Sequence, residues 1–173
     1  MAELFVEILG KPHGFIVFQL LAACRFTIYL SLIAFVGGGA VACLVTLLRI
    51  SNVPSLQKIA TSFIWIFESI PLLMLMFIIG LGMPRLLAVN VDPWTAATIS
   101  LVLFTAAYLA EVWRGAIESV ARGQWEASYA LNIRYSLLLR DIILPQAIKF
   151  GVAPTVGFMV QIIKGTSLAY IIG

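Results

Sequence analysis

The chain has 173 residues, of which 62% are apolar and 11% are charged, and its mean hydropathy is +1.06. About half of a soluble domain is apolar and about a quarter is charged, so this composition excludes the soluble class and leaves a helical membrane protein. The net charge of +3 gives no reason to expect a nucleic-acid partner, and one histidine is too few for a histidine-based metal cluster.

Residues 1–25 are interpreted as an N-terminal lead-in to the membrane domain. Glu3, Glu7 and Lys11 interrupt its start. A cleaved signal peptide has a basic start and an uninterrupted apolar centre, so we expect this segment to be retained.

The first predicted membrane span covers residues 26–48, which carry no formal charge and lie between Arg25 and Arg49. The run is long enough to cross a hydrocarbon core of about 30 Å. Its centre holds three consecutive glycines, residues 37–39. Glycines in a membrane helix let a neighbouring helix approach closely, so we expect tight packing there.

Residues 49–58 are rich in turn formers and predict a short aqueous loop, after which residues 59–83 are again largely apolar. Pro71 has no N–H for the carbonyl of Phe67, so a kink or a break is expected there. Glu68 is costly in lipid unless it faces water, a cation or a cavity, which makes it a candidate for a solute pathway. Alternatively, Glu68 lies at the water boundary of an interfacial helix.

Two further spans are predicted after a turn region at residues 83–92. Trp94 and Trp113 bound the third span, and their spacing places the indoles in the two interfacial belts of one bilayer. The fourth apolar run, residues 150–163, contains Pro154 and is short for a bilayer, so it is expected to cross only with its flanking residues.

Residues 114–149 are predicted to form a large aqueous loop with amphipathic helices, because charged residues recur there among apolar ones. Four charges recur at three- or four-residue spacing: Glu111, Arg114, Glu118 and Arg122. This spacing predicts opposite charges stacked along one face of a helix, for which a solvated face is the simplest explanation.

The distribution of cations predicts the orientation. The loops at residues 49–58 and 114–149 lie on the same side of an alternating path and hold most of the Lys and Arg residues. Cytoplasmic loops carry the excess of these residues, so we expect the large loop to be cytoplasmic and the N-terminus to be outside.

The large loop contains a specific motif over residues 126–145, EASYALNIRYSLLLRDIILP, whose defining residues are Glu126, Ala127, Ser128, Asn132, Ile133, Leu139, Leu144 and Pro145. This motif resembles the EAA loop, the ATPase-docking loop of ABC importer permeases. Asn132 stands where that family has Gly. A left-handed residue that ends a helix favours Gly and then Asn, so the departure is physically mild.

The resemblance extends from residue 27 to residue 173, and the segments FESIPL and KGTSLAYIIG are similar to the polar amino acid permease branch of that family. Glu68 stands where that branch usually has Arg, and Gly165 where it often has an acid. The resemblance implies an all-α bundle of transmembrane helices, the type I ABC importer permease fold, over residues 26–173. It also implies that this chain stops before the final helix, with four of the usual five spans.

The same resemblance implies a transport subunit of the bacterial inner membrane and not an enzyme. The chain has no phosphate-binding loop of the form G-x-x-x-x-G-K-[ST], so it is expected to bind no cofactor. ATP and Mg²⁺ would be bound by a separate ABC ATPase subunit. A second permease, of the same or a sister chain, an extracytoplasmic solute-binding protein and membrane lipid are the other partners implied. Alternatives are an importer of methionine, an oxyanion or an osmolyte, or a membrane transporter or scaffold without an ATPase.

Candidate pathway residues lie at two prolines and at the end of the chain. Pro71 and Pro154 are candidates for broken helices whose freed backbone groups line a solute site, although ordinary packing kinks explain them equally well. Lys164, Thr166 and Ser167 offer a cation and hydroxyls to the carboxylate of an amino acid. Snorkelling of Lys164 to the interface is the simpler alternative.

Overall fold

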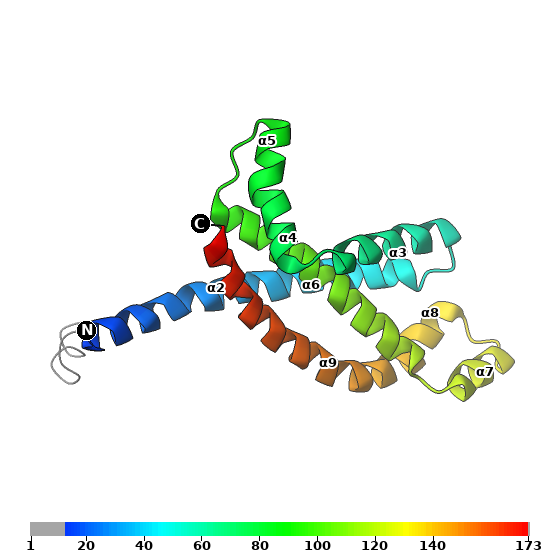
Figure 1. Ribbon diagram of the computed structural model, residues 1–173. Coiled ribbons are helices and arrows are strands. Elements are labelled where there is room, and N and C mark those ends of the chain that lie inside the picture. The colour runs from blue at the N-terminus through cyan, green and yellow to red at the C-terminus, as the bar shows by residue number, and fades with distance from the viewer. Residues whose placement is uncertain (1–12, 173) are drawn as a thin grey trace.

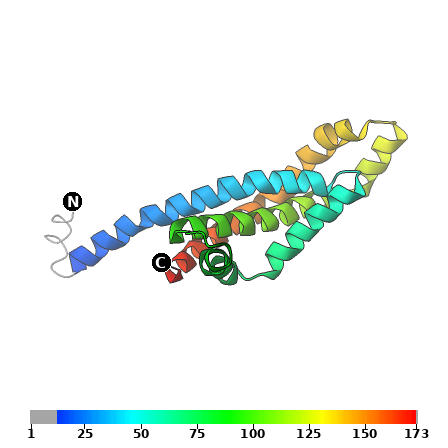
Figure 2. The same cartoon turned by 90° about the horizontal axis from the view of Figure 1, so that it is seen from above.

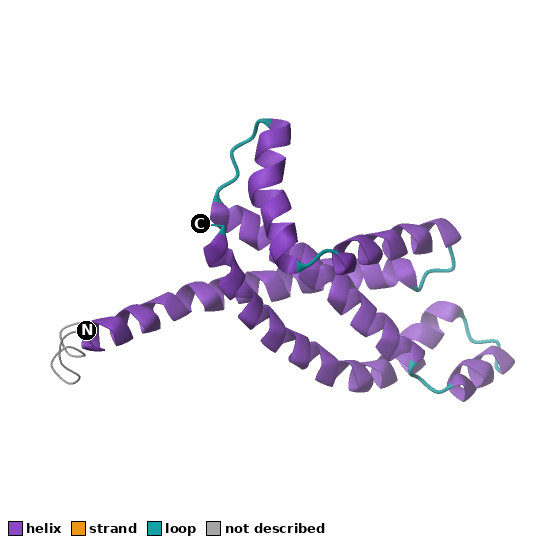
Figure 3. Ribbon diagram, in the orientation of Figure 1, coloured by secondary structure: helices purple, strands orange, loops and turns teal. Residues whose placement is uncertain are grey.

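The computed structural model describes residues 13–172, and every regular element among them is a helix (Figure 3). Residues 1–12 of the predicted lead-in and residue 173 lie outside the described residues. The α-helices, labelled in Figure 1, are α2 (His13–Arg49), α3 (Pro54–Ser69), α4 (Leu72–Phe77), α5 (Met83–Leu87), α6 (Pro93–Glu118), α7 (Arg122–Ala130), α8 (Tyr135–Leu137) and α9 (Leu144–Gly165). Two π-helical segments, Ile78–Gly82 and Leu138–Ile143, and the 3-10 helix Thr166–Ile171 complete the path.

Within residues 13–172, three helical stretches are long and apolar enough to cross a membrane: His13–Arg49, Pro93–Glu118 and Tyr135–Ile171. The bent pair Pro54–Ser69 and Leu72–Leu87 makes a fourth if its two parts count as one span. The predicted positions of the four apolar stretches are therefore confirmed.

The first of these helices is longer than expected. Helix α2 begins at His13, so residues 13–25 of the predicted lead-in are continuous with the first span. Arg25 interrupts the apolar run without ending the helix, and its guanidinium carbon lies 4.7 Å from the centre of the Phe26 ring.

Helices α2 and α6 run side by side and form the centre of the bundle (Figure 2). Gly38 allows a close approach, because a Cβ added there would lie 2.5 Å from Cβ of Thr105. Both helices also carry small buried residues, among them Ala34 and Ala42 on α2 and Ala106 and Ala110 on α6. The expected close packing at the three glycines is thus confirmed, and Gly38 is the residue that requires it.

The break expected at Pro71 is also present. Helix α3 ends at Ser69, Ile70 and Pro71 are extended, and α4 begins at Leu72. The two parts meet at 99°, and Figure 1 shows α4 and α5 turning away from α3. Because Pro71 donates no hydrogen bond, no helical bond crosses this joint.

Pro154 does not break its helix. Helix α9 runs from Leu144 to Gly165 with Pro154 inside it, and the helical stretch extends from Tyr135 to Ile171. The last part of the predicted loop at residues 114–149 is therefore not a separate amphipathic helix, because from Tyr135 onward it is the first part of the last membrane helix. As expected, the short apolar run at residues 150–163 gains its length from its flanks.

Trp113 connects two of the membrane helices. Its indole N–H donates to the hydroxyl of Thr155 on α9 at 3.1 Å, so the ring of this α6 residue packs against α9. Helix α6 continues beyond Trp113 to Glu118.

Candidate functional site

The predicted motif forms a small unit that projects from one end of the bundle (Figure 1). This unit, called here the loop unit, covers residues 122–143: helix α7, a turn at residues 131–134, helix α8 and the π-helical segment that follows. It is narrower than the predicted loop at 114–149, because α6 and α9 extend into that range at both ends.

The turn between α7 and α8 is built around Asn132, whose φ of 53° is left-handed. The N–H of Asn132 donates to the carbonyl of Tyr129, and the N–H of Ile133 donates to the carbonyl of Ser128, both at 3.0 Å. This pair of bonds is the Schellman ending of a helix, in which one left-handed residue satisfies the last free carbonyls. Asn132 therefore takes the conformation expected at the Gly position of the motif.

The three residues at the start of the motif differ in exposure. Glu126 and Ala127 are exposed, whereas Ser128 is 2% exposed and donates its hydroxyl to the carbonyl of Gln124 at 2.7 Å. The small size of Ser128 therefore serves the packing of α7 onto its own chain. Tyr129 on α7 and Leu131 directly after it are also exposed, Leu131 to 74%. Tyr129 lies three residues after Glu126, and this helical spacing was the available sequence signal for it.

The inner side of the loop unit has its own apolar core. Its buried residues are Ile117, Val120, Leu138, Ile143 and Ala147. Ile133, Leu139 and Leu144 of the motif are partly buried against this core, so they hold the unit together. Pro145 is exposed at the junction between the π-helical segment Leu138–Ile143 and α9.

A long-range hydrogen bond attaches the loop unit to the first helix. The hydroxyl of Tyr135 donates to the carbonyl of Ile50, just after the end of α2, at 2.8 Å. Tyr135 could not be predicted from the sequence, because nothing local marks a contact between residues this far apart.

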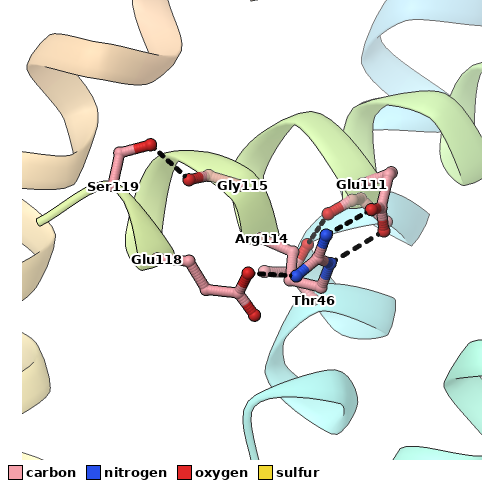
Figure 4. Close-up of polar contacts among 7 residues, drawn as sticks. Thr46, Glu111, Arg114, Gly115, Glu118 and Ser119 are labelled. Carbon is pink, nitrogen blue, oxygen red and sulfur yellow. Dashed lines mark hydrogen bonds and ion pairs between the residues drawn. The ribbon is translucent and has the colours of Figure 1, made fainter.

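The predicted stack of opposite charges along one face of a helix is only partly present at the end of α6. Arg114 contacts both Glu111 and Glu118 (Figure 4), and its Nε donates to Oε2 of Glu111 at 2.9 Å. Arg122, expected on the same face, lies beyond the end of α6 as the first residue of α7. The helix ends at Glu118, so the prediction of one continuous face was wrong at this position.

The candidate pathway residues occupy two regions. Glu68 is half-buried near the end of α3 and lies within electrostatic reach of Glu111 and Arg114 on α6. Gly165, at the end of α9, packs against Leu72, where a Cβ would lie 2.9 Å from Cδ2. The structure thus brings the end of α9 to the joint at Pro71.

The hydroxyls near the end of the chain are already used as donors. Thr166 donates to the carbonyl of Ile163 and Ser167 to that of Lys164, both at 2.7 Å, while the side chain of Lys164 is exposed. Thr166 and Ser167 also line a groove of about 420 Å³ with Phe26, Trp94 and Tyr170 among its other residues. Pro154 is exposed on the surface of α9, away from this groove.

The sequence and the fold define a known class of membrane protein. Residues 34–173 match the family described as "Binding-protein-dependent transport system inner membrane component". The chain therefore belongs to this family, and it is a multi-pass membrane protein of the permease type.

Individual relatives agree with this assignment. The chain is 35% identical over 147 residues to "Probable amino-acid ABC transporter permease protein YckA" of Bacillus subtilis (strain 168), which covers 85% of this chain and 65% of the relative. It is 33% identical over 142 residues to "Probable glutamine ABC transporter permease protein GlnM" of the same organism, with 82% and 65% covered. The chain spans less than two thirds of the length of both relatives.

Solved structures share the fold. The structure described as "Crystal structure of an amino acid ABC transporter with histidines" superposes with a TM-score of 0.79 at 24% identity, over 90% of this chain and 76% of that chain. An inward-facing structure of the MetNI methionine ABC transporter superposes with a TM-score of 0.68 at 19% identity, over 94% and 77%.

Proposed function

We propose that this chain is the permease subunit of an ATP-driven importer of a polar amino acid, and that the loop unit docks a separate ATPase. The observation that carries the proposal is the loop unit itself. It is a folded helix–turn–helix at one end of the bundle, with Glu126 and Ala127 exposed on α7. A carboxylate beside a small residue suits a partner that brings a cation close to the helix surface.

The amino acid cargo is supported by the relatives, two of which are named as amino-acid and glutamine permeases. The family name adds a solute-binding protein on the outer face. A second permease, of the same or a sister chain, completes the path through the bacterial inner membrane. The ATPase partner would hold ATP and Mg²⁺, and this chain would bind no cofactor.

The orientation belongs to the same proposal. The loop unit lies in the cytoplasm, where the ATPase and ATP are found, and the N-terminus lies outside. The cations Arg122, Arg134 and Arg140 on the loop unit, together with Arg49 at the end of α2, support this assignment because cytoplasmic loops carry the excess of Lys and Arg.

Transport would follow from two arrangements of the helices that the ATPase stabilises unequally. A partner shifts such an equilibrium only through contacts that differ between the two states. The exposed side of α7 provides contacts to the ATPase, and the joint at Pro71 provides a place where the path changes shape. The proposed pathway residues are Glu68, Pro71, Lys164, Thr166 and Ser167. Pro154 lies inside an unbroken helix and is assigned a packing role.

Reconstituted uptake tests this function. The intact permease, its genomically adjacent ATPase and its binding protein are placed in liposomes, and accumulation of radiolabelled amino acids is measured with and without ATP. ATP-dependent uptake of an amino acid supports the proposal. Uptake that proceeds without any ATPase would show a secondary transporter. No uptake under any condition would contradict a transport function.

A second measurement identifies the substrate independently of the transport mechanism. Mass spectrometry of the solute that co-purifies with the binding protein is expected to identify a polar amino acid. If the solute is methionine, an oxyanion or an osmolyte, the protein is still an ABC importer permease, but its substrate is not a polar amino acid.

Cysteine labelling tests the orientation. Cys24 and Cys43 are exposed and are first replaced by Ser. Single cysteines are then introduced at Ala127 and at Leu86, which is 83% exposed on α5. A membrane-impermeant maleimide added to intact cells is expected to label Leu86→Cys and to leave Ala127→Cys unlabelled. The reverse pattern would invert the assigned topology.

A further inference from the structure

A groove opens on the surface of the bundle where three parts of the chain meet. Side chains within residues 23–30 of α2, the start of α6 and the 3-10 helix Thr166–Ile171 line a volume of about 420 Å³. Figure 1 shows the end of the chain beside the start of α6. The rings of Phe26, Trp94 and Tyr170 lie along this site, called here the aromatic groove. Phe26 is 50% and Tyr170 is 89% exposed, so the groove is open to its surroundings.

The walls of the aromatic groove carry no formal charge. Apolar side chains such as Leu30 and Ala97 line it beside the three rings, and two of its hydroxyls, those of Thr166 and Ser167, already donate to backbone carbonyls. Such walls suit a hydrocarbon chain. In a bilayer the surrounding lipid tails are equally apolar, so any preference for one lipid must come from its head group.

A cation lies beside the groove. The guanidinium carbon of Arg25 is 4.7 Å from the centre of the Phe26 ring, and this ring meets Trp94 edge-on, with 6.2 Å between the ring centres. Arg25 is exposed, and among the described carboxylates of residues 13–172 none lies within ion-pair distance of it. A guanidinium presents N–H donors in a planar arrangement that matches the oxygens of a phosphate. Arg25 is therefore free to bind an anionic group at the edge of the groove.

Arg25 lies at the depth of the lipid head groups. The uncharged run of residues 26–48 begins directly after it and rises by roughly 34 Å, close to the thickness of a hydrocarbon core. On α6, the exposed cap residue Asp92 precedes Trp94 by two residues, and Trp is enriched at this interfacial level. A phospholipid beside the groove thus has its head group near Arg25 and its chains at the level of Leu30.

We propose that the aromatic groove is a binding site for an anionic phospholipid. The phosphate accepts hydrogen bonds from the guanidinium of Arg25, and one acyl chain lies along Phe26 and Trp94 toward Leu30. A head group with a net negative charge is favoured over a zwitterionic one, because it neutralises a cation that has no carboxylate partner among the described residues. The inference requires only that the chain is embedded in a membrane, so it does not depend on the cargo or on the ATPase.

The fluorescence of Trp94 reports directly on occupation of the groove. In the intact permease the other three tryptophans, Trp65, Trp113 and Trp125, are replaced by Phe. The chain is placed in phosphatidylcholine nanodiscs that contain a small, fixed fraction of either brominated phosphatidylglycerol or brominated phosphatidylcholine. Bromine quenches an indole only at close range. Quenching is expected to show a preference of about fivefold for phosphatidylglycerol, the effect of one cation near an anionic lipid.

Two variants separate the head-group contact from the groove. Arg25→Gln is expected to reduce the preference to about one. Ala23→Phe adds a ring at an exposed lining position without changing the charge, and is expected to weaken quenching by both lipids. The matched controls are Arg85→Gln, an exposed cation on α5, and Ile28→Phe, an exposed position of α2 outside the groove. Both controls should keep the preference of the single-tryptophan chain.

Two further measurements keep the test decisive if a variant folds poorly. Salt at about 1 M, where the screening length is about 3 Å, should lower the preference without any change at Arg25. Native mass spectrometry of the unaltered chain should show phosphatidylglycerol retained over phosphatidylcholine, which avoids removal of the three tryptophans.

Three results would overturn the lipid site. The first is equal quenching of Trp94 by the two lipids, and the second is a preference that survives in folded Arg25→Gln. The third is no quenching by either lipid, which would show that protein, such as a second copy of the permease, covers the groove. None of these results depends on ATP-dependent uptake, so failure of the proposed function and failure of the lipid site are distinguishable.

Discussion

The hydroxyl of Tyr135 donates to the carbonyl of Ile50 at 2.8 Å and so joins the loop unit to the end of the first membrane helix. The ring of Tyr135 and the side chain of Ile50 both pack against the apolar core of the loop unit. The unit is therefore attached to α2 as well as to α6 and α9. A force applied to its outer surface reaches three membrane helices.

Removing this hydroxyl is expected to loosen the loop unit. Tyr135→Phe keeps the ring and loses one hydrogen bond, which corresponds to about 1 kcal/mol of unfolding free energy. The melting temperature in detergent should fall by a few degrees, and proteolysis within residues 119–134 should become faster. Tyr170→Phe, on a side chain that is 89% exposed, is the control and should change neither quantity.

The left-handed residues give a second prediction. Asn132→Ala leaves a Cβ at φ 53° without the local hydrogen bonding that Asn offers, and is expected to destabilise the unit by about 1 kcal/mol. Asn132→Gly should be neutral or slightly stabilising, since Gly has no Cβ to strain.

Ala88 offers a matched comparison, because it also has a φ of 53° at the end of α5. Ala88→Gly is expected to raise the unfolding free energy by about 0.5 to 1 kcal/mol. Thermal unfolding of the variants measures both effects. Equal stability of Asn132→Ala and Asn132→Gly would show that the turn does not require the left-handed conformation.

Local features of the sequence predicted the local features of the structure. The break at Pro71 and the turn at Asn132 follow from the chemistry of single residues, and the apolar stretches follow from composition. The close contact at Gly38 was also expected from three adjacent glycines, although the partner residue Thr105 was not.

Features that depend on distant contacts could not be predicted from one sequence. Ser128 and Ala127 are adjacent small residues, and only the path of the neighbouring helices decides that Ser128 is buried and Ala127 exposed. The bond from Trp113 to Thr155 likewise depends on how α6 meets α9. The predicted face of stacked charges does not reach Arg122, because α6 ends at Glu118 and residues 119–121 separate it from α7. The three- or four-residue spacing of the charges does not reveal where the helix ends.

The glycine contact between α2 and α6 gives a third prediction. Gly38→Ala places a Cβ 2.5 Å from Cβ of Thr105, so the two helices must separate, at an expected cost of about 1 to 3 kcal/mol. Gly39→Ala is the adjacent control, because its Cβ would lie 4.0 Å from the side chain of Trp113, an ordinary van der Waals contact. Thermal unfolding in detergent should separate the two variants, and equal melting temperatures would contradict the tight contact.

The start of α6 predicts a dependence on pH. Asp92 accepts hydrogen bonds from the backbone N–H and the hydroxyl of Thr95, at 2.9 and 2.6 Å, and these bonds hold its pKa below the ordinary value of 3.8. Because the folded-state pKa is the lower one, this carboxylate stabilises the folded chain above pH 3.8. The contribution is lost as the pH falls below 3.8 and through the folded-state pKa.

Asp92→Asn is the variant that checks this sign, since Asn also caps helices but does not titrate here. The difference in melting temperature between the natural chain and Asp92→Asn is expected to be constant near neutral pH. It should change in favour of the variant as the pH is lowered below 3.8. A difference that stays the same through this range would show that the cap does not depend on ionised Asp92.

The docking role of α7 is tested most directly by the affinity of the ATPase for the intact permease. Biolayer interferometry on nanodisc-embedded permease compares the natural chain with Glu126→Arg and Ala127→Trp, which reverse a charge and add bulk on the exposed side of α7. Each variant is expected to weaken binding at least about tenfold, a loss of about 1.4 kcal/mol. Arg85→Glu, an equally large charge change on α5, should bind like the natural chain. Unchanged affinity in both α7 variants, or failure of the natural permease to bind any ATPase, would contradict the account.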